Sequence, residues 1–333
     1  MADVVGGQTM LTLLDWAKLQ APDGQVETVV EILSEQNDIL KDMIWQEGNL
    51  PTGHRTSLRT ALPSASWRVL NKGVSKSSSK SEQYDFGCGM IETYSKIDVD
   101  LADLNGNTAA FRAQEDAAFM EAMNQTFADA LFYGDIADNP SGIIGFDPWF
   151  DSTTSRTGNQ IIKGSGSGNT NTSIFIATWG PDSIFGVFPK GSTAGIKHTD
   201  KGIMTVQDDD GNDFEAYVAH YQWKVGLVVR DYRYFARICN IDVSALATFG
   251  SESDSSDDII TLIIKALHKI KNGRGRKVIY CNETILTYLD LMAQSKTNVS
   301  LSLKEFAGQE VLTFRGIPIR QCDAIVETEA TIS

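Results

Sequence analysis

The residue types that most often carry out chemistry in proteins are scattered along this sequence. It contains 4 cysteines and 4 histidines. No two cysteines stand about two to four positions apart, as a zinc knuckle or a CxxC redox pair requires. The HExxH, GxSxG and Gly-Lys-Ser/Thr patterns of metalloproteases, serine hydrolases and phosphate-binding loops are also missing. Because catalytic residues can be distant in sequence, these absences make an enzyme less expected without excluding one.

Two short patterns resemble ligand-binding loops, but neither has the spacing that such a loop requires. Residues 208–213 are rich in carboxylates, as calcium loops are. Aligning Gly211 with the glycine of an EF-hand loop, however, puts Val206 and Tyr217 where oxygen ligands are required, so a hairpin turn is the better interpretation. Residues 164–168 alternate glycine and serine without the GxGxxG spacing, which indicates a flexible linker. No metal, cofactor or catalytic residue is therefore predicted.

Composition describes an acidic globular protein. The 333 residues include 29 Lys and Arg against 43 Asp and Glu, a net charge of −14, with 42% hydrophobic and 22% charged residues. These fractions argue against wholesale disorder, and the acidic balance argues against a surface that wraps nucleic acid everywhere. No apolar run approaches the ~18 residues of a membrane span, and the first residues do not look like a signal peptide. We expect neither membrane insertion nor secretion.

Hydrophobic periodicity predicts a chain of mixed helices and strands. Apolar residues at helical spacing predict helices over residues 1–20, 26–44, 108–133, 257–272 and 283–294. Alternating or short apolar runs predict strands over residues 84–101, 173–178, 184–188, 215–229, 232–240, 277–281 and 317–322.

The helix predicted over residues 108–133 is the longest, about 40 Å at ~1.5 Å per residue. Four of its apolar residues step by four positions along one face, and we predict that they form its buried core against a sheet. They are Phe119, Met123, Phe127 and Leu131.

A basic segment interrupts this acidic chain. Residues 48–81 contain no Asp or Glu and carry six cations, Arg55, Arg59, Arg68, Lys72, Lys76 and Lys80. Their polarity, with turn signals on both sides, predicts a long β-hairpin or loop that leaves its own domain; a flexible surface loop is the plainer alternative. A second acid-free basic stretch, residues 265–277, is explained in part by the preference of a helix C-terminus for cations.

Several local motifs occur in an order that resembles one protein family. They are Leu-Pro-Thr-Gly-His-Arg at 50–55, Leu-Pro-Ser at 62–64, Trp-Arg-Val-Leu-Asn at 67–71, and the stretches 100–112, 131–134, 179–181, 188–192, 229–234 and 238–242. Together they resemble the major capsid proteins of tailed bacteriophages, whose fold is named after phage HK-97. The resemblance covers roughly residues 25 to 325, and its specificity comes from the ordered set rather than from any one motif.

The resemblance implies an α+β fold of the HK-97 type. It would comprise an N-terminal arm (residues 1–49), an extended β-loop with flanking strands (50–96), a peripheral domain containing the spine helix (97–250) and an axial-type α/β domain with a C-terminal strand (251–333). The strand order would be permuted, as in the subfamily found in some short-tailed phages, because the aromatic strands 214–243 precede the last two helices.

The same resemblance implies a structural shell protein rather than an enzyme. Copies would form the hexamers and pentamers of an icosahedral head around double-stranded DNA, which would lie against the inner face. It also implies a portal and a separate scaffolding protein, allows a decoration protein, and places the chain in the virion after assembly in the bacterial cytoplasm. The subunit interface is expected at Arg55, Arg59, Trp67, Arg68 and Lys72, where a basic loop would meet the acidic surface of a neighbour.

Two other classes stay open from the residues alone. One is an acidic cytosolic enzyme, hydrolase-like, that uses the Asp-rich turn or a histidine. The other is a nucleic-acid-binding module that uses the two basic stretches, whose binding would weaken strongly with salt.

Overall fold

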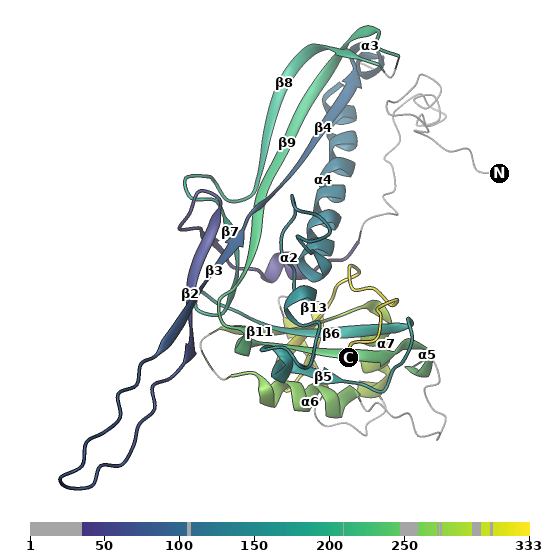
Figure 1. Ribbon diagram of the computed structural model, residues 1–333. Coiled ribbons are helices and arrows are strands. Elements are labelled where there is room, and N and C mark those ends of the chain that lie inside the picture. Colours follow the sequence, from purple (N-terminus) through teal and green to yellow (C-terminus); the bar gives the residue numbers. More distant parts are fainter. Residues whose placement is uncertain are drawn as a thin grey trace. The chain divides into compact units, whose positions relative to one another are not determined.

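Figure 1 shows the computed structural model of the chain. The structure describes residues 35–104, 108–208, 210–246, 259–271, 273, 275–294, 301–306 and 309–333. The helix predicted over residues 1–20, and the predicted N-terminal arm as far as residue 34, lie outside the described residues. The chain divides into two compact units, of which unit 1 includes residues 90–127 and 195–224, and unit 2 includes 36–89, 128–194 and 225–333. Within the described residues, no helix is both long and apolar enough to span a membrane.

Unit 1 is built on long antiparallel strands and most of one long helix. Strand β8 (Ile196–Gln207) pairs with β9 (Asp213–Val229), which also pairs with β4 (Gly89–Asp98). The turn between β8 and β9 is held by the Asp208 carboxylate, which accepts backbone hydrogen bonds from Asp210 and Asn212. Residues 208 and 210–212 therefore belong to a hairpin turn, as the sequence predicted.

Helix α4 (Thr108–Tyr133) has the bounds that periodicity predicted. Alanines and other good helix formers fill it, and the short helix α3 (Val99–Asp103) precedes it. Met123, Phe127 and Leu131 are buried, whereas Phe119 keeps part of its surface exposed. In unit 1, the Phe127 ring meets Trp223 of β9 edge to face, with 4.8 Å between centroids. Phe127 thus packs against the sheet of unit 1, whereas Phe119, on the same predicted stripe, is only partly buried.

Unit 2 contains a large mixed sheet with β6 (Asn171–Trp179) near its centre. All of β6 is buried, and it pairs antiparallel with both β10 (Phe235–Asp242) and β11 (Arg276–Cys281). The sheet continues through β14 (Ile317–Gln321) to β13 (Gln309–Phe314) and β12 (Leu301–Phe306), and through β7 (Ile184–Phe188) to the last residues of β9. The short strands β5 (Ile161–Lys163) and β1 (Trp45–Glu47) add parallel pairings to β10 and β7.

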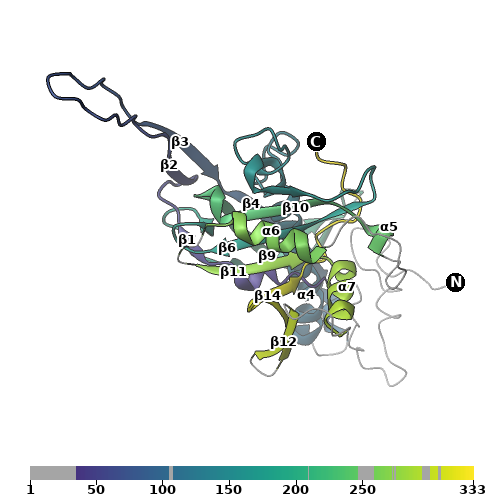
Figure 2. The ribbon, with the colours of Figure 1, turned by 90° about the horizontal axis from the view of Figure 1, so that it is seen from below.

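Helices cover this sheet and close its core. Helix α6 (Ile259–Lys269) packs on β5 and β10, and α7 (Glu283–Gln294) packs on β12 and β14 (Figure 2). The short helix α5 (Val243–Leu246) contacts α7. One apolar cluster includes residues from β6, β10, β11 and β14 and from helices α6 and α7.

The grouping of strands differs from the predicted boundary at residue 250. Strands β5, β6 and β10, expected in a peripheral domain with the spine helix, share a sheet and a core with α6, α7 and β11. A strand buried along its whole length requires partners at both edges and cover on its faces, and β6 finds these partly in residues beyond 250.

The helix predicted over residues 26–44 is much shorter where the structure describes it. Helix α2 covers only Ile39–Asp42, and β1 begins at Trp45. Tertiary contacts override the periodicity here, because Asn37 bridges to Cys322 and the buried Asp42 carboxylate pairs with Arg276, 2.8 Å from its Nη2.

The last residues of the chain are fastened to unit 2 through a buried ion pair. Arg237 is 1% exposed, and its Nη2 lies 3.1 Å from Glu329 Oε2 while its Nη1 lies 2.5 Å from Asp147 Oδ1. The Tyr133 hydroxyl donates to Glu329 Oε1 at 2.6 Å, and burial raises the pKa of this tyrosine. Because the carboxylates compensate the buried guanidinium, residues far apart in sequence are held together.

Candidate interaction surface

A two-stranded hairpin in unit 2 contains the basic segment. Strand β2 (Gly53–Ala61) pairs antiparallel with β3 (Lys80–Gly87), from Gly53 opposite Gly87 to Ala61 opposite Lys80. At its base the backbone approaches closely: a Cβ on Gly53, whose φ is +156°, would lie 2.0 Å from the Phe86 carbonyl oxygen. Only glycine fits such a position without a shift of the backbone, so a side chain here would disturb the base of the hairpin.

Residues 62–79, which we call the tip, continue the hairpin without strand pairing. Every residue of the tip is exposed, and Figures 1 and 2 both show it extending away from the sheet of unit 2. The chain reverses through a turn in which the Lys72 N–H donates to the Val69 carbonyl at 3.2 Å. Ser77 Oγ donates to the Ser64 carbonyl at 2.9 Å and so links the two arms.

The tip exposes apolar side chains as well as cations. Trp67 is 103% exposed and Leu70 is 88% exposed. The other large apolar residues uncovered there are Leu62, Val69 and Val74. Exposed apolar groups clustered among cations are typical of a binding surface rather than of an inert loop.

The cations predicted to form the interface divide into two groups. Arg55 is paired within its own hairpin: its Nε and Nη2 lie 2.5 and 2.6 Å from the Asp85 carboxylate oxygens. This guanidinium lowers the pKa of Asp85. Within the described part of the chain, Arg59, Arg68 and Lys72 form no salt bridge. Asp85 lies directly opposite Arg55 in the strand register. Sequence reasoning missed this partner because Asp85 lies beyond the acid-free segment of residues 48–81.

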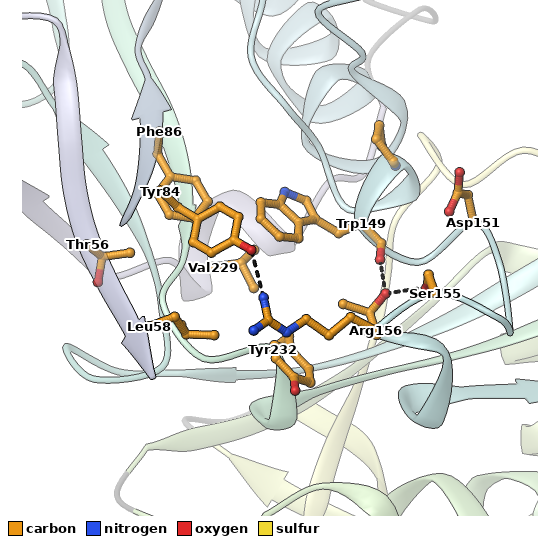
Figure 3. A pocket seen from close by; sticks show the side chains of 12 residues that line it. Thr56, Leu58, Tyr84, Phe86, Trp149, Asp151, Ser155, Arg156, Val229 and Tyr232 are labelled. Carbon is orange, nitrogen blue, oxygen red and sulfur yellow. Dashed lines mark hydrogen bonds between the residues drawn. The ribbon is translucent and has the colours of Figure 1, made fainter. Parts of the chain in front are cut away.

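A cavity of about 220 Å³ lies at the base of the same hairpin (Figure 3). Its walls are largely aromatic and aliphatic, from both hairpin strands, residues 148–157 and residues 229–232 at and after the end of β9. The lining residues are Thr56, Leu58, Tyr84, Phe86, Pro148, Trp149, Asp151, Ser155, Arg156, Thr157, Val229 and Tyr232. Sequence reasoning missed this cavity, since its walls come from four separate segments of the chain.

Hydrogen bonds and ring contacts hold the cavity wall in place. Arg156 Nη1 donates to the Tyr84 hydroxyl at 2.7 Å and to Glu82 Oε2 at 3.0 Å. The Tyr84 hydroxyl donates to the same carboxylate at 2.9 Å, and the two donors lower the pKa of Glu82. Trp149 stacks on Phe86 with 5.7 Å between ring centroids. The wall is therefore preformed.

Comparison with known proteins now identifies the class of the molecule. A model of the family described as Major capsid protein GP7 matches residues 21–333. The cryo-EM structure of bacteriophage Epsilon15 contains a chain that is 31% identical, with a TM-score of 0.79, covering 100% of this chain and 99% of that one. No match was found among curated proteins.

More distant solved structures include other shells. The capsid chain of bacteriophage JBD30 is 9% identical, with a TM-score of 0.48, and the match covers 90% of this chain and 94% of that one. The SrpI encapsulin of Synechococcus elongatus is 9% identical, with a TM-score of 0.42, and the match covers 71% and 97%.

The α+β fold is that of a phage capsid protein of the HK-97 type, and the predicted fold class is confirmed. The chain belongs to the Major capsid protein GP7 family. Its role is structural: it forms the shell of a phage head and is a component of the virion, as the motifs indicated.

Proposed function

We propose that the chain forms the hexamers and pentamers of an icosahedral head around double-stranded DNA, and that the tip binds the neighbouring subunit in each ring. The observation that supports this role is the exposure of Trp67 and Leu70 in a segment that has no strand partner among the described residues. Tryptophan is enriched among the residues that contribute most to binding at protein interfaces. An uncovered tryptophan in a shell-forming protein is best explained by a neighbouring copy that covers it.

The form of the hairpin suits this role. Closed rings of identical subunits require heterologous contacts, in which one surface of a subunit meets a different surface of the next. Strands β2 and β3 carry the tip away from the sheet of unit 2, so the tip is available to a second molecule. A long, narrow segment of this kind buries much interface for each residue that it contains.

Charge gives the contact a preferred partner. Arg59, Arg68 and Lys72 have no carboxylate partner among the described residues, while the whole chain carries a net charge of −14. An exposed ion pair contributes only about 0–1 kcal/mol and is screened by salt. In a shell the contact recurs in every copy, so we expect high salt to slow assembly while the apolar side chains supply most of the affinity.

The other partners are proposed on the family resemblance. They are a separate scaffolding protein, a portal, DNA along the inner face and a decoration protein, with assembly in the host bacterial cytoplasm. The permuted strand order, and the naming of peripheral and axial domains, stay predictions in the same way.

The role of the tip is tested with the double variant Trp67→Ala/Leu70→Ala in the full chain. Negative-stain microscopy and light scattering would report particles, and circular dichroism would report the fold. We expect folded subunits with particle yield reduced at least tenfold. The matched control is Leu104→Ala/Met120→Ala, which removes exposed apolar residues elsewhere and should assemble normally. Normal particles from the Trp67/Leu70 variant would contradict the proposal.

A further inference from the structure

We propose that the cavity at the base of the hairpin is the receptor for Trp67 of a neighbouring copy. This inference rests on the proposed function, in which the tip contacts the next subunit, and adds the site that the tip enters. Each subunit would then present Trp67 at one end of its hairpin and receive the neighbour's Trp67 at the other end.

The cavity has the chemistry that an indole ring requires. Leu58, Phe86 and Val229 give it apolar walls, and Tyr84 and Tyr232 add aromatic faces (Figure 3). Its volume of about 220 Å³ is below the ~300–1,000 Å³ of typical small-molecule pockets, and so suits a single large side chain. A buried aromatic ring removes about 150–250 Å² of surface from water, which makes such a site energetically useful.

The cavity also requires little rearrangement to bind. The Arg156 guanidinium is fixed by the Tyr84 hydroxyl and by Glu82, at 2.7 and 3.0 Å. Thr157 Oγ1 donates to the Trp149 carbonyl, which links two residues of the cavity wall. A preformed site loses little conformational entropy on binding, and a guanidinium held at its edge offers a cation to the face of an incoming indole.

Among the described residues, Trp67 is the side chain that best matches the cavity. Among the tryptophans in the described part of the chain, it alone is exposed. Its 103% exposure shows that it does not enter the cavity of its own chain. Because the tip and the cavity are different surfaces of one subunit, their contact between copies is heterologous and can repeat around a closed ring.

A groove beside the cavity offers room for the rest of the tip. It shares Leu58 and Tyr232 with the cavity, and continues along β2 as far as Leu62. On its far side are two arginine–aspartate pairs, Arg230 with Asp182 and Arg233 with Asp231. These groups provide donors and acceptors to the backbone of an extended segment, so the tip has room to lie in the groove with Trp67 in the cavity.

The direct test is photo-crosslinking in assembled particles. Trp67 is replaced by p-benzoylphenylalanine, which keeps an aromatic side chain, and the adducts are mapped by mass spectrometry. We expect adducts between subunits on peptides containing residues 148–157 or 229–233. The control places p-benzoylphenylalanine at Val69, which is also exposed in the tip. This variant should give few adducts on these peptides.

The outcomes separate the two proposals. Adducts between subunits that map to another surface would overturn the cavity as the receptor while leaving the role of the tip intact. If position 67 gives no adduct between subunits in assembled particles, both proposals are wrong.

A second experiment blocks the cavity with a tryptophan introduced at one of its lining residues. Ser155→Trp places an indole at a lining position, whereas Thr154→Trp places one at an exposed neighbouring residue that does not line the cavity. We expect Ser155→Trp to lower particle yield at least tenfold with an unchanged thermal melt, and Thr154→Trp to assemble normally. Normal assembly of folded Ser155→Trp subunits would overturn the inference.

Discussion

The tip (residues 62–79) and the last residues of the chain (326–333) both lack regular secondary structure in unit 2, but they differ in how they are bonded to the rest of the subunit. In the last residues, the Glu329 N–H donates to the Asn171 carbonyl at 2.9 Å and the Glu329 carboxylate binds buried Arg237. The tip is exposed throughout, with Trp67 and Leu70 uncovered. An irregular segment that is bonded to the subunit through a buried residue such as Glu329 stabilises the fold, whereas one without such an anchor is available for assembly.

The largest expected effect on subunit stability comes from the buried ion pair. Arg237→Met leaves the buried Glu329 carboxylate without its cation, and breaking such a pair typically costs about 3–5 kcal/mol. Urea unfolding of the unassembled subunit, followed by circular dichroism, measures this loss. Arg59→Met is the matched control, because it makes the same change at an exposed arginine, and it should change stability by less than about 0.5 kcal/mol.

Urea unfolding of a tip variant tests the other side of the comparison between the tip and the last residues. Trp67→Ala removes a larger side chain than most core substitutions do, yet we expect the unfolding free energy to change by less than about 0.5 kcal/mol, because no described part of the subunit covers Trp67. A loss comparable to that of Arg237→Met would show that the tip packs within its own subunit, and would break the distinction.

Helix α4 provides a calibration between these extremes. Phe127 is fully buried against Trp223, so Phe127→Ala should cost roughly 3–5 kcal/mol. Phe119 lies on the same predicted stripe but is partly exposed. Phe119→Ala should therefore lower the free energy of unfolding clearly less. Thermal or urea melts of both variants measure the difference, and equal losses would contradict the observed burial.

The paired and unpaired arginines of β2 should behave differently. Arg55→Glu breaks the contact with Asp85 inside the hairpin, whereas Arg59→Glu breaks no described salt bridge and should act on assembly alone. The double reversal Arg55→Glu/Arg59→Glu should slow or block assembly with the fold retained. Light scattering with circular dichroism as the fold control tests this, and normal assembly of the folded double variant would remove these cations from the mechanism.

The Arg55 contact also predicts a pH dependence. Because Arg55 lowers the pKa of Asp85, the contribution of this pair to hairpin stability is present above the ordinary pKa of aspartate and is lost as pH falls through the lowered value. A carbon-13 NMR titration should show the Asp85 pKa rising in Arg55→Glu. An unchanged pKa would show that the two side chains do not interact in solution.

The last prediction concerns thiol labelling, which does not change the stability or assembly of the subunit. The labelling rates of a buried and an exposed cysteine compare the two environments directly. Burial raises the pKa of Cys281 to about 12, so at a pH of about 8 its thiol is almost entirely protonated and shielded. A cysteine introduced in the tip by Ser78→Cys is exposed and should react with a thiol reagent at the rate of a small peptide. Mass spectrometry of labelled peptides distinguishes the sites, and fast labelling of Cys281 in the folded subunit would contradict its burial.

Local patterns in the sequence determined several parts of this structure. Helical spacing defined α4 from Thr108 to Tyr133, and the glycine at 211 marked the turn between β8 and β9. The acid-free run over residues 48–81 marked the hairpin and its tip. Each of these features depends on residues close together in the chain, where side-chain period and turn chemistry act directly.

Only the tertiary structure decided which distant residues meet. The register of β2 and β3 placed Asp85 opposite Arg55, and thereby gave one of the cations expected at the interface a partner within the subunit. The burial of β6 joined β10 to β11 across the predicted boundary at residue 250. The cavity beside Trp149 and Arg156 formed where four segments of the chain converged. Strand register and cavity shape depend on which long-range packing buries the most apolar surface, and a local pattern does not contain that information.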